Sequence, residues 1–272
     1  MASLLGHFFG DGNLSKLHCT YSNKDSGLIE DVISKVKELP IMNLNVVRKY
    51  HKSYHIQFPK LVRNIMKLAG VPEGNKTRQK FEIPEWIMNG SKDIKKSFLQ
   101  ALFDDESSVN IMSKEILISL HKRFEHQGNL RDFLSDLTSL LEELGISGIT
   151  ITERYLPNSK NPKLLKMILR ICGYNNFKEY QKEIGFNHKE KQEKLNNLIL
   201  RYRCIQRRKG EGRDEVLGLL KMNMQLNTKE IAQLMGLKSE GVLPHLRILE
   251  KEGKIKRMIE NSSRSHIWKL NP

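Results

Sequence analysis

Hydrophobic positions along the first 95 residues predict alternating helices and strands. The first stretch, LLGHFFGDG at residues 4–12, reads as a short apolar helix that ends on the carboxylate Asp11. After it, helical spacing, alternation of apolar and polar residues, and the stops at Pro40 and Pro59 mark the elements. The predicted elements are a half-exposed strand at 15–23, a helix at 26–39, two strands around a turn near 51–53, a helix at 60–68 and a short helix after Pro84.

The pattern is repeated in the next hundred residues. LQALFDDES at residues 99–107 is a poorer copy of the first stretch, and it ends on Glu106. The spacing between the copies grows along the chain: Asp11 and Glu106 are 95 positions apart, whereas Lys76 and Lys191 are 115 apart. This is the behaviour of a duplicated unit with lengthened loops. The copy predicts a strand at 109–120, a helix at 129–145, two strands within 146–173 and a helix at 176–185.

A different pattern follows residue 200. Residues 201–213 are basic and contain two glycines, which predicts a linker or a phosphate-gripping arm. Residues 214–272 then predict three helices and a two-stranded hairpin, an order that resembles the winged helix-turn-helix of prokaryotic regulators. The expected domains are repeat 1 at 1–95, repeat 2 at 96–200, the linker at 201–213 and a winged helix-turn-helix at 214–272, and the fold class is α+β.

Charge narrows the range of partners. The chain has 46 Lys and Arg against 31 Asp and Glu, a formal net charge of +15. A basic protein of this kind favours a polyanion partner, because neutralising phosphates releases counterions. No apolar run suggests a membrane span or a signal peptide, and three scattered cysteines favour neither a disulfide framework nor a zinc site. We therefore expect a cytoplasmic, nucleoid-associated protein of prokaryotic type.

The two motif helices carry the candidate chemistry. Gly6 and Gly10 lie four residues apart on one helix face, which allows close packing against a second helix. Such packing brings Asp11 and Glu106 together at two helix C-termini, where negative charge is disfavoured. Divalent cations relieve that repulsion and attract phosphates. Taken alone, Asp11 and Gly12 could also be a helix stop with Gly12 in a left-handed cap.

Five segments in order resemble the LAGLIDADG homing endonucleases: LLGHFFGDG, YSNKDSGLIEDV, GVPEGNK, FEIPEWI and KKSFLQALFDDESSV. The resemblance implies two pseudo-symmetric αββαββα repeats, a sheet from each forming a saddle over DNA, and Mg²⁺ or Mn²⁺ at the carboxylates. The resemblance implies Asp11 and Glu106 as catalytic metal ligands. It also implies Lys76 and Lys191 as catalytic basic residues near the attacking water or phosphate, with Lys189 as an alternative to Lys191. The helix seam is formed by Gly6, Gly10, Ala101 and Asp105.

The copy departs from the family pattern. Ser107 replaces the usual glycine, so the turn there is expected to be strained or reshaped. Asp105 is bulkier than Gly10 opposite it, and we expect the run of Asp104 and Asp105 to be solvated or locally hydrogen-bonded. These departures place activity in question more than the fold.

Candidate DNA contacts lie on the strands, the arm and the last unit. Arginine can read guanine and glutamine can read adenine. An ordinary exposed sheet face is the alternative for any single residue. The candidates are Lys16, His18, Arg48, Lys49, His55, Gln57, Lys114, Thr152, Arg154, Lys166, Arg170, Lys189, Arg207, Arg208, Lys238, His245, Arg247 and Arg264.

The leading functional prediction is a monomeric, site-specific and metal-dependent double-strand DNA endonuclease. Its internal pseudo-two-fold would supply two half-sites, and the winged helix would assist binding. No splicing-type Cys or Ser start and no terminal His-Asn is present, which argues against an intact intein. The alternatives are a non-cleaving DNA-binding transcriptional regulator and an intron RNA maturase.

Overall fold

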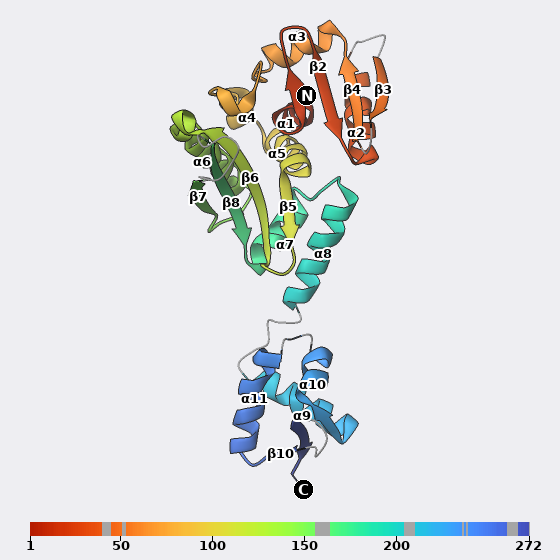
Figure 1. Ribbon diagram of the computed structural model, residues 1–272, viewed down its shortest axis with the longest axis vertical. Helices are drawn as coiled ribbons and strands as arrows, with labels where there is room; N and C mark the ends of the chain where they lie inside the picture. Colours follow the sequence, from red (N-terminus) through yellow and green to blue (C-terminus); the bar gives the residue numbers. More distant parts are fainter. Residues whose placement is uncertain are drawn as a thin grey trace. The chain divides into compact units, whose positions relative to one another are not determined.

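The computed structural model describes residues 1–39, 45–50, 53–155, 164–203, 210–235, 237, 239–259 and 266–271. The chain forms two compact units, Met1–Leu198 and Ile199–Pro272, which are described separately. Both are mixed α/β (Figure 1). In the described part of the chain, no helix combines the length and the apolar character that crossing a bilayer demands.

The first half of unit 1 is a four-stranded antiparallel sheet with helices on one face. Strand order in the sheet is β1-β2-β4-β3. Asp25 caps α2, its side chain accepting hydrogen bonds from the amides of Gly27 and Leu28. The elements are α1 (Ala2–Phe9), β1 (Gly12–Leu14), β2 (Cys19–Asn23), α2 (Ser26–Lys37), β3 (Asn45–Tyr50), β4 (Ser53–Phe58), α3 (Lys60–Leu68), the 3₁₀ turn η1 (Lys76–Arg78) and α4 (Glu85–Met88).

The second half follows the same plan. Its sheet has the order β5-β6-β8-β7, which matches the first sheet position by position. Leucines and Phe133 on one side of the long helix α6 are buried. The elements are α5 (Lys92–Glu106), β5 (Ser107–Asn110), β6 (Glu115–Arg123), η2 (Phe124–His126), α6 (Gln127–Glu143), β7 (Thr150–Tyr155), β8 (Leu164–Cys172), α7 (Tyr174–Glu183) and α8 (Lys189–Arg203).

Two predicted strands each include a turn instead. The stretch at 15–23 contains only β2, because β1 begins directly after α1 and a turn at Ser15 to His18 joins the two. The stretch at 109–120 is likewise split into β5 and β6, with Asn110 accepting hydrogen bonds from the amides of Met112 and Ser113 in the turn. The alternation of residue types did not mark these short turns.

Helices α1 and α5 lie side by side in the middle of unit 1 (Figure 1). Their apolar side chains form the core with the inner faces of the sheets. Phe9 of α1 packs edge-on against Phe98 of α5 and stacks on Phe133 of α6. The helix pair therefore joins the two halves and carries the two motif acids at its C-terminal ends.

In its described residues, unit 2 contains three complete helices and a three-stranded antiparallel sheet in the order β10-β11-β9. Asn227 and Glu230 form a reciprocal capping box at the start of α10. The core includes Trp268, whose indole N–H donates to Thr228 Oγ1 at 2.9 Å. The elements are α9 (Glu211–Asn223), β9 (Gln225–Asn227), α10 (Thr228–Leu234), α11 (Ser239–Lys251), β10 (Ile255–Ile259) and β11 (His266–Leu270). Strand β9 was not expected from the sequence.

Candidate active site

The seam between α1 and α5 is built on small residues. A Cβ added at Gly6 would lie 2.4 Å from the carbonyl oxygen of Phe98 and 2.8 Å from Cβ of Ala101. A Cβ added at Gly10 would lie 2.5 Å from Cβ of Asp105. The two backbones are therefore as close as these residues allow, and Gly10 leaves room for the larger Asp105 opposite it.

Asp11 and Glu106 interact electrostatically at the ends of this helix pair. Desolvation, and then the negative charges of Asp105 and Glu106, raise the pKa of Asp11 to about 7. Desolvation also raises the pKa of Glu106, although the charge of Lys76 opposes it. Asn23 donates a hydrogen bond to Asp11 Oδ2 at 2.8 Å. Excess negative charge at this point favours a bound cation.

Lys76 and Lys191 occupy matching places on the two helix ends. Lys76 Nζ donates to the carbonyl oxygens of Phe9 (2.9 Å) and Gly10 at the end of α1. Lys191 Nζ donates to those of Phe103 (3.2 Å) and Asp104 (2.5 Å) at the end of α5. Desolvation lowers the pKa of Lys76 to about 8 and also lowers that of Lys191. Lys189 is exposed at the start of α8, so Lys191 is the counterpart of Lys76.

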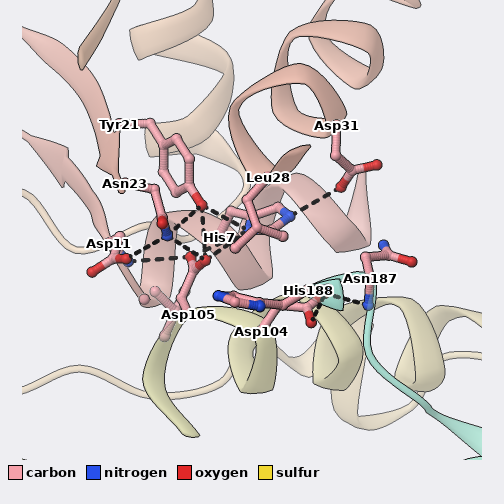
Figure 2. A network of polar contacts seen from close by, with 12 residues as sticks. His7, Asp11, Tyr21, Asn23, Leu28, Asp31, Asp104, Asp105, Asn187 and His188 are labelled. Carbon is pink, nitrogen blue, oxygen red and sulfur yellow. Dashed lines mark hydrogen bonds and ion pairs between the residues drawn. The ribbon is translucent and has the colours of Figure 1, made fainter. Parts of the chain in front are cut away.

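The side chains of the two acids before Glu106 are buried and hydrogen-bonded, so of the two expectations for this run the solvated one is wrong, and the hydrogen bonds are to residues distant in the chain. Asp104 accepts hydrogen bonds from the amides of Asn187 (3.2 Å) and His188 (3.0 Å), and desolvation raises its pKa to about 6. Asp105 points the other way, into a network with His7 and Tyr21 (Figure 2). Asp104 and Asp105 are adjacent on α5 but form hydrogen bonds on opposite sides of the seam.

Ser107 is accommodated without the expected strain. Its backbone is extended, with φ of −94° and ψ of 165°, and its hydroxyl donates to the carbonyl oxygen of Phe103 at 2.6 Å. Gly12, its counterpart, is not in the left-handed region either, so the alternative of a left-handed cap there is wrong. Gly12 is needed for space, because a Cβ would lie 2.5 Å from Cα of Phe8.

Each motif acid opens onto a cavity of different chemistry. A cavity of about 420 Å³ beside Asp11 is lined by polar and charged residues, among them Asn23, Asp104, His188 and Lys191. A cavity of about 220 Å³ beside Glu106 is lined by Lys76, Lys122, His121 and Ser119 together with apolar residues such as Phe9, Phe81 and Leu102. The two sides of the site are therefore unequal.

The oxygen donors present fit a hard divalent cation. Within the described residues, no group of three or more His, Cys, Asp or Glu side chains is arranged to hold a metal ion. Mg²⁺ needs no such group, because it is often bound through one or two carboxylates together with waters and substrate phosphates. Asp11 and Glu106 are two carboxylates whose pKa values are raised mainly by desolvation, and a bound cation would favour their charged forms.

The outer face of the second sheet carries a basic row. Strand register places Arg154, Lys166 and His121 side by side across β7, β8 and β6. This face is opposite the buried Leu165, Met167 and Leu169. Thr152 and Arg170 share it, and Arg170 donates to Thr152 Oγ1 and to Glu115 at 3.1 Å. Lys114 lies in the turn between β5 and β6, with φ of +56°.

In its described side chains, the outer face of the first sheet is polar and carries less charge than that of the second. His55 and Gln57 lie on it with Thr20 and Ser22, and Ser22 Oγ is 2.6 Å from His55 Nδ1. His18, in the turn before β2, reaches Gln57 at 3.4 Å. Lys16 is exposed in the same turn.

Lys49 does not belong to that face. It pairs with Tyr54, which shares the side of buried Ile56, and its Nζ lies 5.3 Å from the centre of the Tyr54 ring. Neighbouring residues of a strand point to opposite faces, so Arg48 and Lys49 cannot both face outward. Arg48 pairs with His55 in register, and its side chain lies outside the described residues.

In unit 2 the candidates are only partly covered by the structure. His245 packs against the start of α9, where a Cβ on Gly212 would lie 2.8 Å from its ring, so it does not extend freely from α11. Arg247 is exposed on α11. Pro244 is the sixth residue of that helix, in its second turn. Arg207, Arg208, Lys238 and Arg264 lie outside the described residues.

Sequence reasoning missed the polar residues that surround the motif acids. His7 stands at an apolar position of α1, and Tyr21 and Asn23 appeared only as strand residues. Buried Lys122 was missed too: its Nζ lies 3.7 Å from the centre of the Phe81 ring and donates to Asn129 Oδ1. The one available signal was a histidine within an otherwise apolar helix.

Comparison with known proteins finds a family model that matches part of the chain. Residues 93–185 match the model of the LAGLIDADG-like domain. The chain is 30% identical over 139 residues to the tRNA-splicing ligase RtcB of Pyrococcus furiosus, which is 50% of this chain and 14% of the ligase. It is 28% identical over 199 residues to the probable translation initiation factor IF-2 of Methanocaldococcus jannaschii, which is 71% of this chain and 16% of the factor.

Two solved structures are similar at low identity. The homing endonuclease I-DmoI in complex with DNA and Mn matches with 16% identity and a TM-score of 0.44, over 67% of this chain and 94% of that one. The N-terminal LAGLIDADG domain of DUF199/WhiA matches with 18% identity and a TM-score of 0.41, over 68% of this chain and 81% of that one.

Proposed function

We propose that this chain is a site-specific, divalent-metal-dependent DNA endonuclease of LAGLIDADG type. The observation that carries the proposal is the pairing of Asp11 and Glu106 at the ends of two helices packed through Gly6 and Ala101. A metal there, held by these two carboxylates, would activate water and stabilise the leaving oxygen. Lys76 and Lys191 offset the negative charge at the two helix ends.

The wider molecule supports DNA as the substrate. Two sheets of equal strand order offer outer faces with polar and basic side chains, which suits pseudo-symmetric repeats over two half-sites. The order of elements in unit 2 suits a winged helix-turn-helix that assists binding. We take the endonuclease to act as a monomer.

The similarity to parts of two known proteins suits a segment that is inserted into unrelated proteins. A ligase of RNA and a translation factor share no activity by name, yet each resembles this chain over a small part of its own length. A mobile endonuclease unit would produce such a distribution. The activities of those two proteins are not assigned to this chain.

A non-cleaving DNA-binding regulator is the second candidate. It is favoured by one observation, the charged Asp105 in the seam next to the two motif acids. A regulator would use the same sheet faces and unit 2 without needing a metal.

The test compares cutting and binding on a randomised DNA library. The full chain is incubated with the library and Mg²⁺, beside Asp11→Asn, Glu106→Gln and the control Asp93→Asn, an exposed acid at the other end of α5. We expect enriched cut sites for the wild type and the control, and loss of cutting by at least a hundredfold in the other two with binding retained. Selective binding without any Mg²⁺-dependent cut would establish the regulator instead.

A further inference from the structure

Asp105 is the most extensively hydrogen-bonded acid in the seam. Its side chain is completely buried, and it accepts from Tyr21 OH at 2.8 Å and from His7 Nδ1 at 3.1 and 3.2 Å (Figure 2). The amide of Asp11 donates to it at 3.3 Å, and Asn23 Nδ2 lies 3.5 Å away. A carboxylate has about four lone-pair directions. Four donors occupy those of Asp105, so it is not available as a metal ligand.

The charge of Asp105 is compensated within the network. Burial alone lowers the pKa of His7, but hydrogen bonds to Asp105 and Asp31 outweigh it and raise that pKa to about 9. The other ring nitrogen, Nε2, lies 3.3 Å from Asp31 Oδ2. Asp31 in turn pairs with Lys35 one turn further along α2. A charged His7 therefore lies between two carboxylates, those of Asp105 and Asp31.

The network reaches Asp11 along two routes. One is the hydrogen bond from the Asp11 amide to Asp105 Oδ2. The other is Asn23, whose amide group donates to Asp11 Oδ2 at 2.8 Å and also faces Asp105 Oδ1 and the Tyr21 hydroxyl at 3.3 Å. Both the backbone and the carboxylate of Asp11 are thus fixed relative to Asp105.

Glu106 lacks such support. Strand register and motif alignment place Leu102, Gly10, Ile118 and Leu120 at the positions that His7, Asp105, Tyr21 and Asn23 hold around Asp11. These four residues offer no polar side chain. In the described part of the chain no hydrogen bond reaches the Glu106 carboxylate. One of the two acids is therefore oriented by partners and the other is free to adjust.

We propose that Asp105 is a positioning residue for Asp11, acting through the Asp11 amide and Asn23, so that only one carboxylate of the site is preorganised for metal. The proposal rests on the proposed metal-dependent nuclease. It explains why an acid is tolerated at a close helix crossing, because the same carboxylate that fills the space beside Gly10 also orients the motif acid.

The test uses Asp105→Asn in the full chain, with Asp104→Asn as the matched control. Asp104 is also a buried acid of α5, but its partners are the amides of Asn187 and His188, on the other side of the seam. Two quantities are measured: the ¹H–¹⁵N resonance of the Asp11 amide and the affinity for Mn²⁺ by electron paramagnetic resonance. Loss of such an outer partner typically weakens metal affinity about tenfold or more.

We expect Asp105→Asn to shift the Asp11 amide resonance and to weaken Mn²⁺ binding about tenfold, while Asp104→Asn changes neither. Asn23→Ala, which alters no buried charge, should weaken Mn²⁺ binding similarly, and the double variant should be no weaker than the single ones. Wild-type affinity in Asp105→Asn with an unmoved Asp11 amide would overturn the positioning role. Absence of Mn²⁺ binding in the wild type would instead overturn the proposed nuclease and, with it, this role.

Discussion

His7 shows how one side chain can connect two halves of a protein. It lies in α1, contacts Asp31 of α2 and Asp105 of α5, and is completely buried. In isolation a buried histidine should be neutral, since burial disfavours its charge. Two carboxylates reverse that preference and raise its pKa to about 9. The residue therefore acts as an internal cation that permits an acid in the helix seam.

His7→Gln should lower the free energy of unfolding in a pH-dependent manner. Because the folded pKa of about 9 exceeds the usual 6.5, the stabilisation is fully present below pH 6.5 and is lost as the pH rises through 9. A shift of this size corresponds to roughly 3 kcal/mol. Urea unfolding at pH 6, 7.5 and 9 measures it. His18→Gln, at an exposed histidine of the same half, is the control and should show no such trend; a pH-independent loss in His7→Gln would contradict a charged His7.

At the scale of elements, the close packing of α1 against α5 decides the structure of the site. Helices α1 and α5 approach until backbone and Cβ atoms are in contact, and this fixes where the motif acids lie. The strands that follow each helix then turn their alternate side chains to the outer faces. The candidate site and the sheet faces proposed to contact DNA are thus set by the same two helix–strand junctions.

Gly6→Ala should destabilise unit 1. The added methyl would lie 2.4 Å from the carbonyl oxygen of Phe98, which belongs to a helix backbone and cannot give way easily. Overpacking of this kind costs about 1–3 kcal/mol or more. Gly128→Ala is the control, since nothing lies within 4 Å of its added Cβ and alanine favours a helix by up to ~1 kcal/mol. Chemical unfolding measures the free energy of unfolding of both variants. An unchanged value in Gly6→Ala would mean that the helices are not in close contact.

Lys166→Ala should weaken DNA binding. Lys166 lies at the centre of the basic row on the outer face of the second sheet, between Arg154 and His121. Loss of one phosphate contact should reduce the slope of log affinity against log salt concentration by about 1. Lys178→Ala removes an exposed lysine from α7, which packs on the sheet's other side, and should leave the slope unchanged. Fluorescence anisotropy over a salt series measures both, and equal effects would exclude this face as the principal contact.

At the scale of the whole molecule, charge is divided between the units. Residues 199–272 carry sixteen Lys and Arg against eight Asp and Glu, about half of the total net charge of +15. Unit 2 has its own core around Trp268 and its own capped helices. It can therefore contribute phosphate contacts of its own while unit 1 contains the candidate site.

A chain ending at residue 203, where α8 ends, should bind DNA more weakly than the full chain. Because the shorter chain neutralises fewer phosphates, its affinity should fall less steeply with salt, so the loss relative to the full chain should be largest at low salt. Binding by residues 1–203 is compared with the full chain at 50 and 200 mM salt. If both bind alike at each concentration, unit 2 has another role.

The sequence by itself determined the elements and the pairing of the motifs. Helical spacing, the proline stops and the growing offset between copies predicted most helices, both motif acids and the matched lysines. These features are local, or they repeat along the chain. They can be predicted because local propensity and periodicity depend on the order of residues alone. Short turns such as Ser15 to His18 were missed because their residues also fit a strand.

Only the tertiary structure decided how the acids differ from one another. Asp104, Asp105 and Glu106 are consecutive, yet their surroundings differ. Asp104 accepts a hydrogen bond from the segment before α8, Asp105 contacts His7, and Glu106 lines a cavity. Their interactions and their roles depend on groups up to 98 residues away in the chain. A carboxylate's pKa and orientation follow from the charges, donors and solvent around it, and those are set when the helices pack, not by the neighbours in sequence.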